Sequence, residues 1–275
     1  MKIILSLFLC FWYVLVQSSE IHSEFKQFQY VNQLPSNSVQ CMIKDSEGYI
    51  WFGTRDGLCR FDGYRIKVFR SNVIDHNRLT NNNIRCVLED KQHRLWIGTN
   101  EGVNILDKSN YTVKAFDMNV IGRDRILDMC LDKKGNIWIS TGSKGIVRVG
   151  ADGHCVAYRV TGLNKMTLSN VASSIYQDSK GNVWALFWMG GVAMYNPQKD
   201  KFVFYPPIGT QNNPFKMLED KNHNYWICTW GDGLFAFNPK DNRRPYTPVL
   251  FRKNGKQVKM NNCKSCCGNL VPQPS

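Results

Sequence analysis

Five tryptophans recur along the chain at nearly constant spacing, and this recurrence constrains the fold more than any other feature. They are Trp51, Trp96, Trp138, Trp184 and Trp226, separated by 45, 42, 46 and 42 residues. An aspartate precedes each tryptophan by six residues, and a glycine follows it by six or seven. Periods of about 40 to 45 residues are typical of propeller blades. The sequence therefore predicts about five tandem blades, one for each repeat.

Each repeat divides into four strand signals separated by turn residues. In the first repeat, apolar alternation predicts strands at 39–44, 50–54, 58–61 and 64–69. The aspartate and a glycine three residues later suit the turn between the first two strands, because Asp bonds the turn backbone and Gly adopts positive φ. His93 and His223 replace this glycine, and histidine tolerates positive φ better than most residues. The tryptophan, on the second strand, is large enough to fill the space between blades.

The predicted fold is an all-β propeller of about five four-stranded blades, in a closed or an incomplete ring. Residues 25–31 resemble the outer strand expected at 201–205, and such an orphan strand is what a ring closed by joining both ends would need. Residues 249–260 predict a hairpin around Asn-Gly. We expect the propeller over residues 20–252 and a basic, cysteine-containing, poorly ordered tail over 253–275.

Residues 1–19 have the pattern of a secretory signal peptide. Lys2 precedes an apolar stretch at 3–16 that only Ser6 interrupts, and small residues follow at 18–19. The alternative is a buried N-terminal strand or helix, but a run of about 14 apolar residues suits the core of a signal peptide. No later segment reaches the roughly 18 apolar residues of a membrane-spanning helix. We therefore expect export.

Charge and cysteine content suggest neither nucleic acid nor metal as a partner. Lys and Arg number 35 against 22 Asp and Glu, but much of this excess lies after residue 239, where a solvated end is the simpler interpretation. Cys41 and Cys86 occupy one repeat position on predicted strands, where packed thiols belong. Cys263, Cys266 and Cys267 cluster without the further ligands that zinc requires. We expect no metal and no cofactor.

Three recurring segments resemble the two-component regulator propeller repeat. They are a start of the type Leu-Thr-Asn-Asn at 79–82, a middle of the type Asp-x-x-Gly-x-Ile-Trp-x-Gly-Thr, and a trailing Gly-Leu-x-x-Phe. Residues 51–61 and 96–102 are close matches, and the resemblance covers roughly residues 34–239. In that family such repeats form the exported sensor half of hybrid histidine kinases, anchored in the inner membrane and common in gut Bacteroidetes. They are linked there to the detection of polysaccharide fragments.

The resemblance implies a periplasmic, non-catalytic sensor of a two-component system whose ligand is a glycan or oligosaccharide. This sequence carries no phosphoacceptor helix, ATP lid or receiver domain. Its output would therefore need a histidine kinase or further domains as partner, and a homodimer stays open. Five repeats are fewer than the family usually has per ring, which leaves a truncated product and a short variant as alternatives.

Candidate ligand contacts lie four to six residues after each tryptophan. In an antiparallel meander, the connection after the second strand and the connection between blades emerge at the same end, around one mouth of the channel. Aromatic faces beside charged and amide groups suit sugar rings. The predicted site consists of Arg55, Asn100, Lys144, Trp188, Trp230 and Asp232. The alternative is that these are ordinary turn residues and that both tryptophans pack between blades.

No catalytic residues are predicted. The aspartate recurs in all five repeats, whereas a catalytic carboxylate pair is needed only once and a turn is needed in every blade. The chain is therefore expected to act by binding and not as an enzyme. A propeller lyase or glycosidase and a protein-binding scaffold are the alternatives.

Overall fold

The structure is a computed structural model that describes residues 29–71, 78–116, 120–159, 170–241, 243–253 and 256–259. It contains two compact units, Met1–Asn32 and Gln33–Ser275. A turn at 29–30 leads into the short 3₁₀ helix η1 (Val31–Gln33), so the described part of the expected strand at 25–31 is not a strand. The rest of that strand, the predicted signal peptide and the cysteine cluster lie outside the described residues.

The described residues of the second unit form five antiparallel four-stranded sheets in which neighbouring strands are consecutive in the chain. We number these blades in chain order: β1 (Val39–Lys44), β2 (Ile50–Thr54), β3 (Gly57–Phe61) and β4 (Ile66–Phe69); β5 (Ile84–Glu89), β6 (Leu95–Thr99), β7 (Gly102–Leu106) and β8 (Val113–Ala115); β9 (Ile126–Leu131), β10 (Ile137–Thr141), β11 (Ile146–Val149) and β12 (Cys155–Tyr158); β13 (Ala172–Gln177), β14 (Val183–Phe187), β15 (Gly191–Asn196) and β16 (Lys201–Phe204); β17 (Pro214–Glu219), β18 (Tyr225–Thr229), β19 (Gly233–Phe237) and β20 (Tyr246–Pro248). The prediction of five four-stranded blades is confirmed. The expected hairpin near the end is also present, as β21 (Leu250–Lys253) paired with β22 (Lys256–Lys259).

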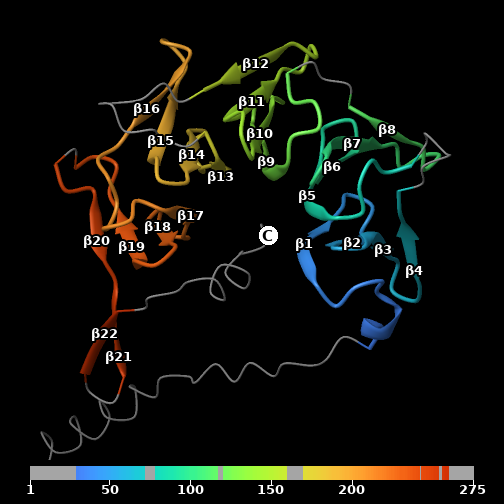
Figure 1. The fold of residues 1–275 in the computed structure, drawn as a ribbon, viewed down its shortest axis with the longest axis horizontal. Coiled ribbons are helices and arrows are strands. Elements are labelled where there is room, and N and C mark those ends of the chain that lie inside the picture. The colour runs from blue at the N-terminus through green and yellow to red at the C-terminus, as the bar shows by residue number, and fades with distance from the viewer. Residues whose placement is uncertain are drawn as a thin grey trace, which may run out of the picture. The chain divides into compact units, whose positions relative to one another are not determined.

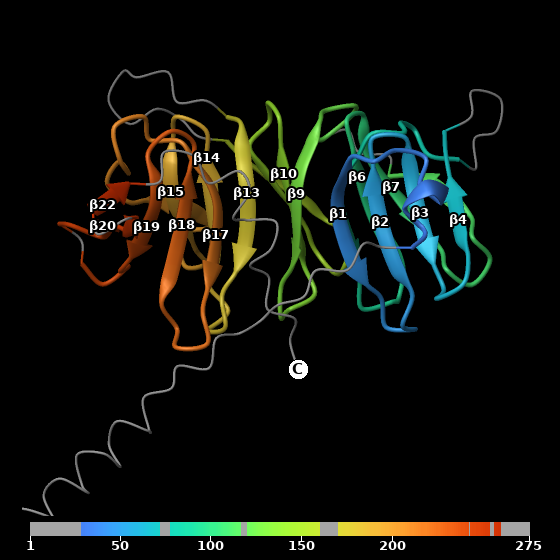
Figure 2. The ribbon, with the colours of Figure 1, turned by 90° about the horizontal axis from the view of Figure 1, so that it is seen from below.

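The first strand of each blade lies innermost and the fourth lies outermost (Figure 1). Figure 2 shows the strands from the side, with their connections gathered at two opposite ends. The inner strands pack in chain order, β1 with β5, β5 with β9, β9 with β13 and β13 with β17. Among the described strands, β17 and β1 do not pack to a comparable extent, and Figure 1 shows a gap between blade 5 and blade 1.

The repeated aspartate joins the first turn of each blade to its tryptophan. In blade 1, the backbone N–H groups of Glu47 and Tyr49 donate to Asp45 Oδ1 at 3.0 and 2.9 Å, and Trp51 Nε1 donates to Asp45 Oδ2 at 2.8 Å. The same indole bond forms in the other four blades at 2.8 to 3.0 Å. This pattern explains the strict spacing of six residues, and it makes the aspartate a structural group.

Histidine takes the left-handed turn position where glycine is missing. Gly48 has a φ of +93°, and His93 and His223 have φ values of +60° and +63°. The prediction that histidine adopts positive φ in these two turns is confirmed. Both rings also approach a carboxylate of their own blade, His93 that of Glu89 and His223 that of Glu219.

The tryptophans of blades 1 to 4 are buried against the next blade. Trp51 packs with Ile84, Val87 and Leu95 of blade 2, and Trp184 packs in the same way with residues of blade 5. Burying so large a side chain removes roughly 150–250 Å² from water. The recurring tryptophan is therefore the main hydrophobic contact between consecutive blades, as the sequence predicted.

Polar contacts join consecutive blades beside Trp51, Trp138 and Trp184. Ser46 donates its backbone N–H and its hydroxyl to the Glu89 carboxylate at 2.7 and 2.6 Å, and Ser179 and Glu219 repeat both contacts between blades 4 and 5. Between blades 3 and 4, the backbone N–H of Lys133 donates to the side-chain oxygen of Gln177. In all three cases the residue after one blade's Asp bonds the residue before the next blade's Asp.

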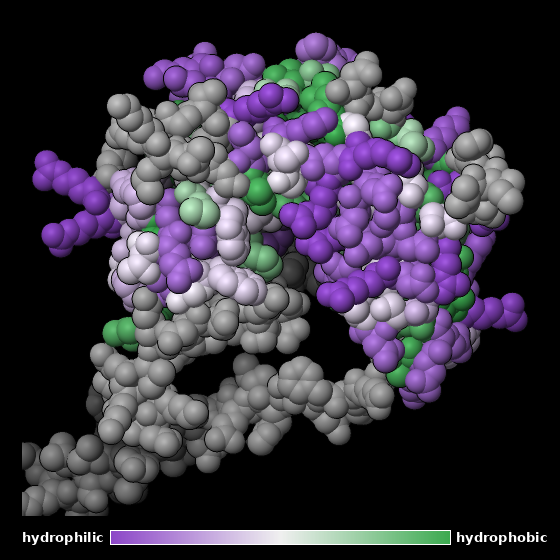
Figure 3. All heavy atoms as spheres, in the orientation of Figure 1, coloured by the Kyte–Doolittle hydropathy of each residue, from purple (hydrophilic) through white to green (hydrophobic). Residues whose placement is uncertain are grey.

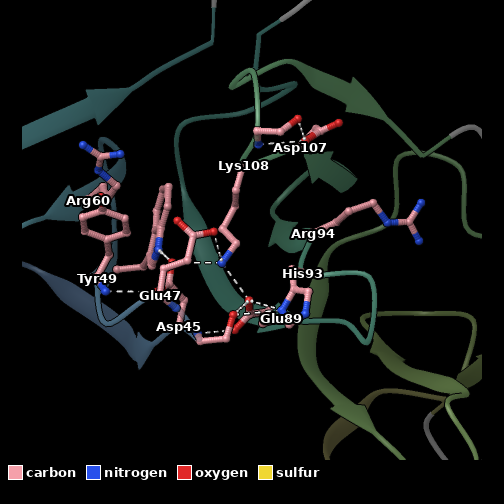
Figure 4. A network of polar contacts seen from close by, with 12 residues as sticks. Asp45, Glu47, Tyr49, Arg60, Glu89, His93, Arg94, Asp107 and Lys108 are labelled. Carbon is pink, nitrogen blue, oxygen red and sulfur yellow. Dashed lines mark hydrogen bonds and ion pairs between the residues drawn. The ribbon is translucent and has the colours of Figure 1, made fainter.

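Lys108 adds a buried cation between blades 1 and 2 (Figure 4). It follows β7, and its Nζ lies 2.7 Å from Glu89 Oε1, 3.0 Å from Glu47 Oε1 and 3.3 Å from Asp45 Oδ2. Burial by itself lowers the pKa of Lys108, but hydrogen bonds to Glu89 and Glu47 and the charge of Asp45 outweigh it, so the pKa is raised. The ammonium group therefore stays charged and holds the two blades together.

Candidate functional site

Every inner strand contains the same β-bulge near its start. The pairing register with the second strand shifts between Val39 and Cys41 in blade 1 and at the matching position of the other four blades. A bulge leaves one residue outside the regular ladder and turns its side chain in a new direction. The bulged residues are Gln40, Arg85, Leu127, Ser173 and Phe215.

All five bulged residues line one pocket of about 630 Å³. Because each belongs to an innermost strand, the pocket lies at the centre of the arc of blades (Figure 1). Arg125, Asp128, Trp188 and Lys216 complete the part of the lining that carries charge or an indole ring. Figure 3 shows this centre hollowed, with hydrophilic side chains crowded over blades 1 and 2. We call this hollow the channel pocket.

The channel pocket carries more positive than negative charge. Arg85, Arg125 and Lys216 face a single carboxylate, that of Asp128. Burial lowers the pKa of Arg85, and the nearby positive charges of Arg125 and Arg55 lower it further. An anion would relieve the repulsion among these three arginines, and guanidinium groups bind carboxylate or sulfate oxygens in paired hydrogen bonds.

Lys216 and Asp128 form an ion pair across the channel pocket, from β17 to β9. Lys216 Nζ lies 2.6 Å from Asp128 Oδ2, which also accepts a hydrogen bond from the hydroxyl of Ser174 at 2.6 Å. Burial by itself lowers the pKa of Lys216, but the charge and the hydrogen bond of Asp128 raise it, and the net shift is upward. Because Asp128 is paired with Lys216, Arg85 and Arg125 are the cations of the pocket that remain to bind a ligand.

Aromatic rings form the side of the channel pocket next to blades 4 and 5. The ring centres of Trp188 and Trp230 lie 6.2 Å apart, and those of Phe215 and Trp230 lie 6.5 Å apart. The backbone N–H groups of Trp188 and Trp230 donate to the carbonyl oxygens of Val171 and Asn213, at the starts of their own inner strands. This bond holds the turn after each second strand against the pocket.

The structure separates the six predicted site residues into two groups. Trp188 lines the channel pocket, the ring of Trp230 lies beside that of Trp188 at a tilt, and Arg55 lies near enough to Arg85 to lower its pKa. Asn100 donates its backbone N–H to Asn83, and its side-chain oxygen is buried without a partner in the described part of the chain. The residues that sequence reasoning missed are the bulged ones. The sequence feature that could have identified the bulged residues is that they differ from blade to blade at one fixed position of a repeating strand.

Lys144 and Asp232 make contacts that support turns. Lys144 Nζ donates to the carbonyl oxygen of Ile121 at 2.9 Å. The buried Asp232 carboxylate accepts from the backbone and hydroxyl of Thr210 and from the backbone of Gln211. Neither side chain is in the lining of the channel pocket. Their role as ligand contacts stays a prediction, and these contacts favour the alternative that they are turn residues.

The described residues contain neither a cluster of metal-ligating side chains nor a helix long and apolar enough to cross a membrane. The first statement applies to groups of three or more His, Cys, Asp or Glu residues. The second applies to helices of at least 18 residues.

Known proteins share both the repeat and the fold. Residues 33–56, 78–101 and 121–143, in blades 1 to 3, match the family model described as the two component regulator propeller. Over 51 residues, the chain is 43% identical to Histidine kinase P4 of Formosa agariphila, a match that covers 18% of this chain and 4% of that protein.

Two solved structures show the same kind of fold. The extracellular domain of a B. thetaiotaomicron protein described as a one component system is 24% identical, with a TM-score of 0.64 over 84% of this chain and 34% of that one. Virginiamycin B lyase of Staphylococcus aureus is 13% identical, with a TM-score of 0.66 over 86% of this chain and 78% of the lyase. The chain thus spans about a third of the first structure and a small part of the kinase. The resemblance inferred from the sequence is confirmed for three segments, in blades 1 to 3, which match the two-component regulator propeller, and the solved structures share the propeller-type fold of the chain.

Proposed function

We propose that this chain is the ligand-binding propeller of a two-component sensor outside the cytoplasm, and that its ligand is a glycan fragment bearing negative charge. The observation that carries the proposal is the channel pocket. It brings Arg85 and Arg125 into one lining with Trp188 and Phe215. The repeat family and the similarity to part of a histidine kinase support the sensor role.

The two sides of the channel pocket suit the two faces of an acidic sugar. The C–H face of a sugar ring stacks on aromatic side chains, while its carboxylate or sulfate pairs with guanidinium groups. Ser173 and Gln40 add polar side chains to the lining, where the Ser173 hydroxyl donates to backbone carbonyl oxygens and Gln40 Nε2 donates to Asn83 Oδ1. A pocket of about 630 Å³ is within the usual range for small ligands, so an oligosaccharide end would fit better than a polymer.

Signalling would follow from differential binding. A ligand that contacts several inner strands favours the arrangement of blades in which all contacts form, and it shifts the population toward that arrangement. The signal peptide proposed at residues 1–19 would deliver the chain to the periplasm. A histidine kinase, in a partner or in further sequence, would provide the output.

Replacing both Trp188 and Trp230 by alanine is expected to weaken binding of a uronic-acid oligosaccharide at least tenfold. The loss of two ring contacts should reduce the binding free energy by roughly 1.4 kcal/mol or more. Isothermal titration calorimetry measures the affinity, and Tyr64→Ala, which removes an exposed ring from blade 1, is the matched control. Unchanged affinity in the double variant would remove the aromatic side from the site.

A propeller enzyme is the second candidate, because the virginiamycin B lyase shares the fold. The same oligosaccharides, incubated with the chain and followed by chromatography, distinguish the two functions. A sensor returns them intact, whereas a lyase or glycosidase produces shorter products. A protein-binding scaffold would neither bind nor cleave them.

A further inference from the structure

The residue after each bulge occupies one shared position of the repeat, where it pairs with the fourth residue of the second strand. In chain order these residues are Cys41, Cys86, Asp128, Ser174 and Lys216. In blades 3 to 5 they form one hydrogen-bonded group, because Lys216 Nζ and the Ser174 hydroxyl both donate to Asp128 Oδ2 at 2.6 Å. The inner strand of blade 4 packs between those of blades 3 and 5. One carboxylate oxygen therefore links three blades.

Blades 1 and 2 add no charge at this position. Burial raises the pKa of Cys41 to about 12 and that of Cys86 well above its ordinary value, so both thiols stay neutral. The charges at this position are those of Asp128 and Lys216, and they cancel. The described lining of the channel pocket holds three cations and this one carboxylate, which leaves two positive charges, one on each arginine of the lining.

We propose that the ligand of the channel pocket carries two anionic groups, of which the first binds Arg85 and Arg125 and the second takes Lys216 from Asp128. This inference rests on the proposed function and narrows its ligand to a dianionic glycan fragment. Two negative charges would balance the two positive charges of the lining. The bulged residue and the residue after it lie about 3.3 Å apart along a strand, so the two anionic groups should be neighbours on the glycan.

Lys216 is built to change its partner, and Asp128 keeps hydrogen-bond donors when it does. Lys216 lines the channel pocket with 39% of its side chain exposed, and a lysine ammonium ends a flexible four-carbon stem. Without Lys216, Asp128 Oδ2 still accepts from the Ser174 hydroxyl, and Asp128 Oδ1 accepts from the backbone N–H of Met129 at 3.1 Å. Neither carboxylate oxygen is then left without a donor, which keeps the change of partner accessible.

Asp128 is thereby the residue that sets how much negative charge a ligand needs. Its carboxylate competes with the ligand for Lys216, and it repels the second anionic group for as long as it stays in place. A ligand with one negative charge gains only the contacts with Arg85 and Arg125. A ligand with two negative charges also gains Lys216. The built-in competitor therefore disfavours weakly charged ligands, which is a way to obtain specificity.

Isothermal titration calorimetry with three oligosaccharides of equal length tests this inference. One is neutral, one carries a single uronate, and one carries two neighbouring uronates. The unaltered chain should bind the dianionic oligosaccharide about tenfold more tightly than the monoanionic one, because a hydrogen bond between charged groups contributes roughly that factor. Asp128→Asn removes the competitor, and it should raise the affinity for the dianionic oligosaccharide more than that for the monoanionic one.

The decisive variant combines Asp128→Asn with Lys216→Met, which removes the ion pair without changing the net charge of the pocket. Replacing a buried ion pair by neutral side chains often leaves stability unchanged, and urea unfolding checks that the variant is folded. This variant should bind the monoanionic oligosaccharide as the unaltered chain does, and it should lose the preference for the dianionic one. Lys134→Met, at an exposed lysine outside the pocket lining, is the matched control and should keep that preference.

The outcomes separate this inference from the proposed function. Equal affinity of the unaltered chain for the two acidic oligosaccharides would overturn the inference and leave an acidic glycan as the ligand. A preference for the dianionic oligosaccharide that persists in the double variant would also overturn it, because the ion pair would then be structural only. Acidic oligosaccharides that bind no more tightly than the neutral one would contradict the proposed function, and the inference with it.

Discussion

Replacing Trp184 by alanine is expected to lower the free energy of unfolding by about 3–5 kcal/mol. The indole is buried between blades 4 and 5, and its ring centre lies 5.4 Å from that of Phe237 and 5.6 Å from that of Tyr205. The substitution leaves a cavity, and it also removes the indole donor from the buried carboxylate of Asp178. Urea denaturation followed by circular dichroism measures the change.

Trp226→Ala is the matched comparison, because it removes the same side chain and the same bond to an aspartate. No described blade covers Trp226, so its replacement should cost less than half as much as that of Trp184. An equal decrease in the free energy of unfolding for both variants would show that the tryptophans stabilise their own blades and not the contact between blades.

Replacing Lys108 by methionine is expected to lower the free energy of unfolding by about 3 kcal/mol. Removing one partner of a buried ion pair typically costs roughly 3–5 kcal/mol, and the lower end applies here because Glu47 is half exposed. Without the ammonium group, the carboxyl groups of Asp45 and Glu89 lose the cation that lies near both of them. Thermal unfolding measures the loss, and Lys114→Met on the exposed side of β8 is the control.

The Lys108 contact also predicts how stability depends on pH. Burial by itself raises the pKa of Glu89, but hydrogen bonds from Lys108 and Ser46 outweigh it and hold that pKa below its ordinary value of 4.5. The stability that this carboxylate contributes is therefore present above pH 4.5 and is lost as pH falls through the lowered pKa. Lys108→Met should make the acid-induced loss smaller. A steeper loss in the variant would contradict this account.

Regular features of the fold followed from the sequence because they repeat. The spacing of Asp and Trp gave the number of blades, and turn chemistry explained why His93 and His223 stand where glycine is usual. The bond between each aspartate and its indole was not predicted, because a spacing of six residues does not show that a turn and a strand face each other. The orphan strand expected at 25–31 was wrong for residues 29–31, where a turn and η1 form.

The candidate site was only partly predictable for a related reason. The positions four residues after the repeat tryptophans of blades 4 and 5 are Trp188 and Trp230. They were predicted correctly as neighbours of the pocket, because the turn after the second strand reaches the channel pocket. Arg85 and Phe215 were missed, because a bulge changes which way a side chain points and leaves no mark in apolar alternation. The ligand role of Asp232 stays a prediction, and in the structure its carboxylate accepts hydrogen bonds from Thr210 and Gln211.

The central claim is that the channel pocket binds an acidic glycan through its arginines, and calorimetric titration with a uronic-acid oligosaccharide and its neutral counterpart tests it most directly. We predict that Arg85→Gln combined with Arg125→Gln weakens binding of the acidic oligosaccharide at least tenfold and leaves that of the neutral one unchanged. Arg123→Gln, at a highly exposed arginine outside the pocket lining, should bind as the unaltered chain does. Equal affinity of the double variant and the unaltered chain for the acidic oligosaccharide would contradict the claim.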